Sequence, residues 1–157
     1  MLSTKLMRTL TLGLFIAAPG AMAADALNCP SGTKQSGSKA EGLFCRKVSG
    51  QAGEYFVHGP YAEFHANGQK ATSGQFADGL KTGVWTFYDA SGKEVGKTEF
   101  NSGTYHGQRI QYFASGKPRL VEEYKNGRKN GLVKEYSEDG KVISQVRYEN
   151  NQPVASK

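Results

Sequence analysis

The sequence has few cysteines, few prolines and no long apolar run after its first 23 residues. Among 157 residues there are 2 Cys and 5 Pro, against 20 Gly. Two cysteines are too few for a four-cysteine zinc site or a disulfide-dense scaffold. Low proline beside high glycine excludes a collagen-like or proline-rich chain. With 38% hydrophobic and 22% charged residues, the composition indicates one globular domain, neither disordered nor membrane-embedded.

Sequence motifs of common active sites are missing as well. The chain has no phosphate loop, no G-x-G-x-x-G, no H-E-x-x-H and no G-x-S-x-G. His58, His65 and His106 stand apart, without the spacing of metal ligands. The carboxylates are scattered, and none is expected in a pocket that would shift its pKa. We therefore expect no catalytic residue, cofactor or metal; an enzyme with a pocket beside the N-terminal element is the alternative.

The first 23 residues have the order of features found in a secretory signal peptide. Lys5 and Arg8 give a positive start, residues 10–18 are mostly apolar, and residues 21–23 read Ala-Met-Ala, a cleavage signal. The apolar run is far shorter than the ~20 residues that cross a membrane. A short buried helix is the alternative. The sequence therefore predicts a soluble exported protein, periplasmic or secreted, that is not an integral membrane protein.

Cys29 and Cys45 are the only cysteines, so an oxidising compartment allows one intramolecular disulfide. The segment between them is rich in Gly, Ser and Lys and has little apolar area to hold it in place. A disulfide there would contribute roughly 3 kcal/mol by restricting the unfolded chain. The alternative, two reduced thiols, fits poorly with export.

A repeat of 24 residues covers residues 55–153 without an insertion. The glycine columns are Gly59, Gly83, Gly107, Gly131; then Gly68, Gly92, Gly116, Gly140; then Gly79, Gly103, Gly127, with Asn151 in the fourth place. The aromatic columns are Phe64, Tyr88, Tyr112, Tyr136 and Phe76, Phe100, Tyr124, Tyr148. Such a period indicates units that stack on their neighbours. Residues 24–54 fall outside this repeat, and we expect them to form an N-terminal cap that contains the disulfide. Residues 154–157 are expected to form a C-terminal tail.

Each unit contains two turn signals, as at Asn67-Gly68 and Asp78-Gly79, because these residue pairs tolerate positive φ. Two short strands fill the space between the turns, for example residues 84–88 and 94–100. We expect an all-β fold, an elongated antiparallel sheet of stacked hairpins. A compact barrel or sandwich would need more continuous Val and Ile than the chain contains.

Counting residues by two assigns side chains to the faces of this sheet. Both aromatic columns fall on one face, and Tyr61, Trp85 and Phe87 on the other. If exposed, these three rings could stack on a sugar or a peptide. An exposed apolar patch is costly, so the favoured alternative is that residues 24–54 fold back over them.

The spelling of residues 78–88, DGLKTGVWTFY, followed by Ser91-Gly92, resembles a MORN repeat of the bacterial variant type. Residues 126–131 repeat its glycine spacing between Tyr124 and Tyr136. The resemblance implies an elongated β-repeat with a non-catalytic role in binding or scaffolding. Together with the predicted signal peptide, it leads us to expect an exported interaction module of the cell envelope. Some bacterial relatives are labelled antitoxins, so a cytoplasmic antitoxin-like binding protein is the alternative.

Basic residues gather in the third and fourth repeats. Together with the three rings named above, they make up the candidate binding surface: Lys117, Arg119, Lys125, Arg128, Lys129 and Lys134. Such residues could meet an acidic protein or an anionic envelope component, whereas nucleic acid is not expected for an exported protein. The alternative is a solvated edge whose lysines prevent unwanted strand pairing. Neither surface specifies an oligomeric state.

Overall fold

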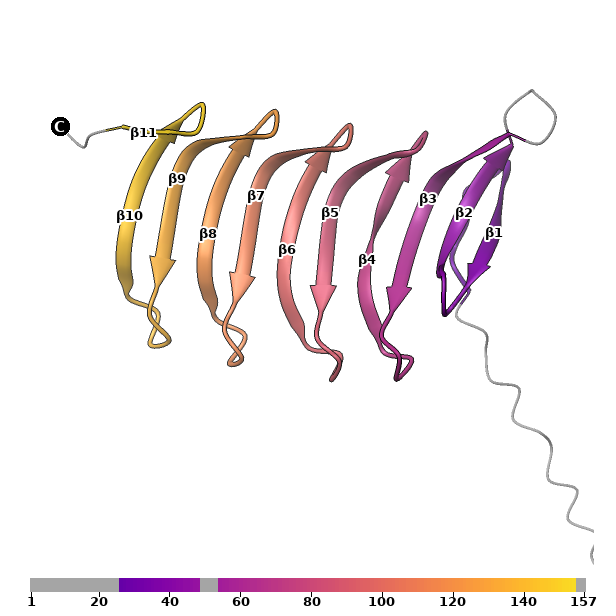
Figure 1. Cartoon of the computed structure of the whole chain (residues 1–157), viewed down its shortest axis with the longest axis horizontal. Coiled ribbons are helices and arrows are strands. Elements are labelled where there is room, and N and C mark those ends of the chain that lie inside the picture. Colours follow the sequence, from indigo (N-terminus) through magenta and orange to yellow (C-terminus); the bar gives the residue numbers. More distant parts are fainter. Residues whose placement is uncertain (1–25, 49–53, 155–157) are drawn as a thin grey trace, which may run out of the picture.

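The computed structural model describes residues 26–48 and 54–154, which form one open antiparallel sheet (Figure 1). Eleven strands follow one another in chain order: β1 (Thr33–Ser38), β2 (Gly42–Val48), β3 (Tyr55–Phe64), β4 (Lys70–Ala77), β5 (Leu80–Tyr88), β6 (Glu94–Asn101), β7 (Thr104–Tyr112), β8 (Pro118–Lys125), β9 (Arg128–Tyr136), β10 (Val142–Glu149) and β11 (Gln152–Val154). The described residues contain no helix. The expected all-β sheet of stacked hairpins is therefore confirmed.

Two kinds of turn connect the strands, and each kind forms a row at one end of the strands (Figure 1). We call these two rows of turns the edges of the sheet. All eleven glycines expected in turns have positive φ, between 64° and 127°. Seven of them lie in turns, but Gly59, Gly83, Gly107 and Gly131 lie inside β3, β5, β7 and β9, so the expectation of turns at these four positions is wrong. At one edge, two-residue turns such as Asp78-Gly79 have positive φ at both positions, which matches the twist of the flanking strands. Asn150 and Asn151 form the last of these turns, with φ of 50° and 70°. Asn151 thus takes the left-handed conformation that the sequence predicted for it.

The two-residue turns also connect successive repeats. The N–H of Gly79 donates to the carbonyl of Val57 at 2.8 Å, although β4 separates the turn from that part of β3. The same bond recurs 24 residues further on each time: Gly103 to Lys81 at 2.9 Å, Gly127 to Tyr105 at 2.8 Å, and Asn151 to Lys129 at 3.0 Å. Each hairpin is therefore fixed to the preceding one at this edge as well as along its strands.

The two aromatic columns lie on opposite faces of the sheet, so the expectation of one doubly aromatic face is wrong. The Trp85 ring packs against Phe76, with ring centroids 5.1 Å apart, and a Cβ on Gly74 would overlap it. The Tyr88 hydroxyl instead lies 3.4 Å from the hydroxyl of Ser73, the neighbour of Gly74. Because neighbouring strand residues point to opposite faces, we distinguish a Trp85 face and a Tyr88 face.

Shifts of register explain the wrong assignment. The pairing of β5 with β6 shifts between Phe87 and Tyr88, and the pairing of β4 with β5 shifts between Ser73 and Gln75. A bulge adds a residue to one strand, so a count by two that runs through it changes face. The sequence shows the glycines that accompany these bulges but not the bulges themselves.

The described part of the cap extends the sheet and does not cover the Trp85 face. Strand β2 pairs edge to edge with β3, and the predicted disulfide joins Cys29 to Cys45 with Cα atoms 5.6 Å apart. Leu27 lines a hollow with Ser73 and Thr86, on the Tyr88 face. The expectation that residues 24–54 fold over Tyr61, Trp85 and Phe87 is therefore wrong for the described part of the cap. The predicted signal peptide and the last three residues of the tail lie outside the described residues.

Replacing Gly92 with valine should lower the free energy of unfolding by about 1–3 kcal/mol, because its φ of 85° strains any β-branched residue. Ser91→Ala, in the same exposed turn, should cost much less. Thermal unfolding of both variants measures the difference. Equal melting temperatures would contradict the role of the glycine in this turn.

Candidate binding surfaces

A row of packed rings runs across the Trp85 face, and Trp85 is its buried centre. Successive contacts link Tyr61, Phe76, Trp85, Phe100, Tyr105 and Tyr124, with centroids 5.1–6.0 Å apart. Trp85 is only 1% exposed, and its indole N–H donates to the carbonyl of Gln75 at 3.2 Å. The Lys81 ammonium covers the ring, 4.1 Å from a centroid. Trp85 is therefore a core residue, and its candidacy as an exposed stacking platform is wrong.

The other two candidate rings on this face are half-buried. Tyr61 donates its hydroxyl to Glu63 at 2.7 Å. Burial, together with that hydrogen bond and the Glu63 charge, raises the pKa of Tyr61 to about 12. Phe87 borders a hollow over Gly96 and Gln111. A binding role for Tyr61 and Phe87 stays a prediction.

The centre of the Trp85 face changes its chemistry from repeat to repeat at equivalent positions. In-register pairs here are Tyr61 with Gly74, Trp85 with Thr98, Arg109 with Glu122, and Val133 with Val146. Small partners leave room for the large rings of the first two repeats. The third repeat uses an ion pair at the same positions, and the fourth uses two valines.

Glu122 is the buried acid of this series and is only 3% exposed. It accepts hydrogen bonds from Arg109 and from the Lys129 ammonium, the latter at 2.8 Å. Burial acts to raise the pKa of Glu122, but the hydrogen bonds and charges of Lys129 and Arg109 outweigh it and hold the pKa below its usual value. The expectation that no carboxylate sits where its pKa would shift is therefore wrong. The sequence does contain one indication of this site. Arg109 stands at the position of Trp85, and a partly buried arginine needs an acidic partner on the neighbouring strand.

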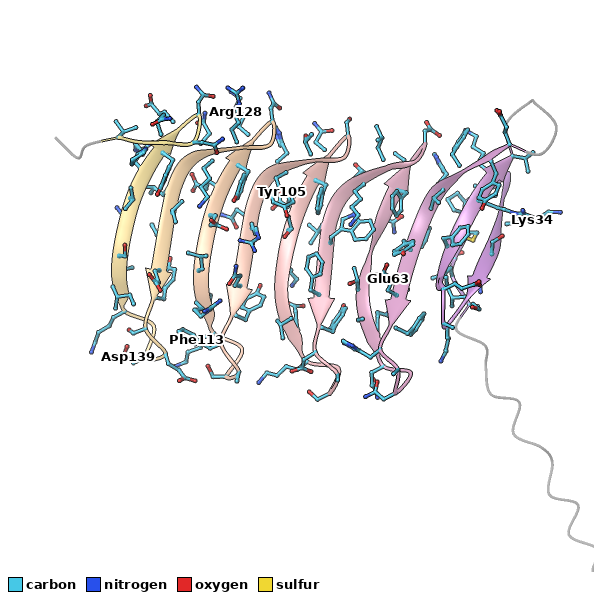
Figure 2. The ribbon with its side chains drawn as sticks, viewed as in Figure 1. Lys34, Glu63, Tyr105, Phe113, Arg128 and Asp139 are labelled. Atoms are coloured by element: carbon cyan, nitrogen blue, oxygen red, sulfur yellow. A yellow bond between two sulfur atoms is a disulfide. The ribbon has the colours of Figure 1, made fainter. Side chains whose placement is uncertain are left out.

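The six basic candidates do not form one surface. Lys129 is bound to Glu122 and also lies 5.4 Å from the ring centroid of Tyr148. Arg119 donates to the side chain of Gln111, and Lys117 donates to the carbonyl of Glu138 at 3.1 Å. Lys117 belongs to the turn of Phe113, which lies at the opposite edge of the sheet from Arg128 (Figure 2).

Lys134 is also separate, because its neighbour Val133 occupies the Trp85 face and Lys134 therefore points to the Tyr88 face. The contiguous basic patch expected from the sequence is wrong. Only Lys125 and Arg128 remain together, opposite each other across one turn.

These two cations line a hollow of about 470 Å³ at the edge of the two-residue turns. We call this hollow the basic notch and define it by Lys125, Asn126, Arg128, Asn130 and Asn150. It combines one ammonium, one guanidinium and three carboxamides, which suits an anion flanked by groups that both donate and accept hydrogen bonds.

The charge reversal Lys129→Glu should lower the free energy of unfolding by about 2 kcal/mol or more, because it places a second carboxylate beside buried Glu122. Arg128→Glu, the adjacent change at the exposed notch, should leave stability within about 0.5 kcal/mol. Urea denaturation of both variants tests the contrast. Unchanged stability in Lys129→Glu would show that the contact with Glu122 does not hold in solution.

Within residues 26–48 and 54–154, no three His, Cys, Asp or Glu side chains come together as a metal site requires. Nor does this part of the chain contain a helix with the length and apolar character needed to cross a bilayer.

The hairpins of the third and fourth repeats decide the classification. A family model described as MORN repeat variant matches residues 105–126 and 129–150. Residues 105–126 and 129–150 are thus two MORN-variant repeats. The two matches fall on β7–β8 and β9–β10, and the same pairing pattern continues back through β3–β4. A search of curated proteins finds no match. MORN repeats indicate a repeat-based binding or scaffold module.

Proposed function

We propose that the chain is an exported, non-catalytic interaction module of the bacterial cell envelope, whose MORN-variant sheet binds a protein partner. The observation that carries the export part is the Cys29–Cys45 disulfide. Such bonds persist in oxidising compartments and are rare in the cytoplasm. The leader-like sequence of residues 1–23 supports the same location.

The disulfide has a defined task in this fold. Cys45 is fully buried, and the bond holds the segment before β1 against the Tyr88 face. Pro30 in that segment lies against Gly59, at a place where a Cβ would collide with the proline ring. Because this polar end of the chain buries little else than Leu43, Cys45 and Ala62, a covalent bond is a suitable means of fixing it.

The binding part rests on the open sheet and its unneutralised cations. A single-layer sheet presents both faces and both edges, and repeat proteins use such extended surfaces for recognition. The hollows along the sheet lie open on its surface. Of the hollows described above, the basic notch is the one lined by two adjacent cations.

Fractionation of a bacterium that expresses the full chain tests this proposal. We expect a mature protein that begins at Ala24, found outside the cytoplasm, with Cys29 linked to Cys45 in non-reducing peptide mapping. Intact Met1 in the cytoplasm, with two thiols that alkylate without denaturant, would refute export. That result would favour the cytoplasmic antitoxin-like alternative.

A further inference from the structure

Successive hairpins present equivalent turn positions whose side chains differ. Lys125 pairs with Arg128 across its turn just as Asn101 pairs with Thr104 and Ala77 with Leu80. The five positions of the basic notch correspond, one repeat earlier, to Asn101, Ser102, Thr104, His106 and Asn126, and two repeats earlier to Ala77, Asp78, Leu80, Thr82 and Ser102. The earlier positions hold neither Lys nor Arg. Of these three equivalent turns, only the one between β8 and β9 therefore carries the pair of cations.

The two cations of the notch are available to a ligand. Neighbouring basic residues are engaged, since Lys129 contacts Glu122 and Arg119 contacts Gln111. Among the residues that the structure describes, no carboxylate lies within ion-pair distance of Lys125 or Arg128. Figure 2 shows Arg128 at the turn edge, toward the C-terminal end of the sheet.

The backbone around the notch is fixed before any ligand arrives. The turn at Asn126-Gly127 is held by the bond from Gly127 to Tyr105, and the next turn by the bond from Asn151 to Lys129. The Asn151 side chain also accepts the N–H of Lys129 at 2.7 Å. A preformed site costs less ordering entropy on binding.

We propose that the basic notch binds an acidic peptide segment of a partner protein. The inference rests on the proposed binding function and names its site and ligand. Lys125 and Arg128 supply charge-assisted hydrogen bonds to Asp or Glu carboxylates. The carboxamides of Asn126, Asn130 and Asn150 donate to main-chain carbonyls and accept from main-chain N–H groups. None of the five lining residues is aromatic, so the notch offers no ring on which a nucleic-acid base would stack.

Fluorescence anisotropy with a labelled peptide of alternating Glu and Ser tests this directly. The disulfide-bonded full-length mature protein should bind it, and the double variant Lys125→Gln, Arg128→Gln should bind at least about tenfold more weakly. The matched control is Lys34→Gln with Lys70→Gln, which removes the same charge elsewhere. Lys34 lies at the far end of the sheet from Arg128 (Figure 2), so this control should retain the affinity.

A transplant of the charges provides the second arm. Adding Asn101→Lys and Thr104→Arg to the double variant rebuilds the cation pair one repeat earlier and should restore part of the binding, because only one of the three carboxamide positions is an asparagine there. Equal affinity of the wild type and the Lys125→Gln, Arg128→Gln variant would overturn the proposal. So would binding of the matched Gln and Ser peptide, or binding only of an oligomeric uronic acid. None of these results bears on export, which fractionation decides separately.

Discussion

Replacing Trp85 with alanine should lower the free energy of unfolding by about 3–5 kcal/mol, as expected for a fully buried aromatic residue. The ring is 1% exposed and contacts Tyr61, Phe76 and Phe100. In the described residues no second sheet or helix packs against this one, so the ring row replaces a conventional core there, and the other buried apolar side chains are Leu43, Cys45 and Ala62. The loss would open a cavity at the centre of the row.

Val84→Ala is the matched control for this variant. Val84 precedes Trp85 in β5 but is 49% exposed, and its truncation should cost less than about 1 kcal/mol. Urea denaturation, followed by circular dichroism, compares the two variants. Similar midpoints would mean that the indole is not packed in solution, and Trp85 would return as a candidate binding residue.

Replacing Arg109 with valine should cost about 3 kcal/mol, because it removes one of the two cations that compensate buried Glu122. Adding Glu122→Val should restore stability to within about 1 kcal/mol of the wild type. The fourth repeat supplies the precedent, since Val133 and Val146 pair at the equivalent positions. A double variant no more stable than Arg109→Val would show that the ion pair is essential to this repeat.

The pH dependence of stability gives the same pair a second test. The pKa of Glu122 is lower in the folded protein than its usual value, because the hydrogen bonds and charges of Lys129 and Arg109 outweigh the effect of burial. Its stabilising contribution is therefore complete above the unfolded-state pKa and is lost as the pH falls through the folded-state pKa. The wild type should lose more stability on acidification than the double valine variant. Parallel pH profiles for the two proteins would contradict the assignment.

The sequence predicts the architecture well because the repeat makes local requirements visible. A glycine or asparagine column marks positions with positive φ, and Gly92 and Asn151 both have it. Two such turns in each 24-residue unit leave only enough chain for two strands. The single possible cysteine pair likewise predicts the disulfide from Cys29 to Cys45.

The faces and the candidate site were less predictable, because they depend on register across strands. A bulge near Tyr88 reverses the face of that column relative to Phe100, and no residue type identifies it uniquely. Proximity in sequence also suggested one basic patch, whereas neighbours such as Arg128 and Lys129 point to different surroundings. Lys129 differs from Arg128 because its ammonium contacts buried Glu122. This contact depends on strand register, which the sequence does not reveal.

The bond from each two-residue turn to the preceding repeat makes the sheet a molecular ruler. The N–H groups of Gly79, Gly103, Gly127 and Asn151 all make the same backbone hydrogen bond to the preceding repeat. A whole repeat could therefore be inserted or removed without a different contact between neighbouring repeats. Neighbouring strands are spaced by about 4.8 Å, so each two-strand unit adds about 10 Å of length. The number of repeats thus sets the reach between the disulfide-bonded end and Arg128, independently of the chemistry at either end.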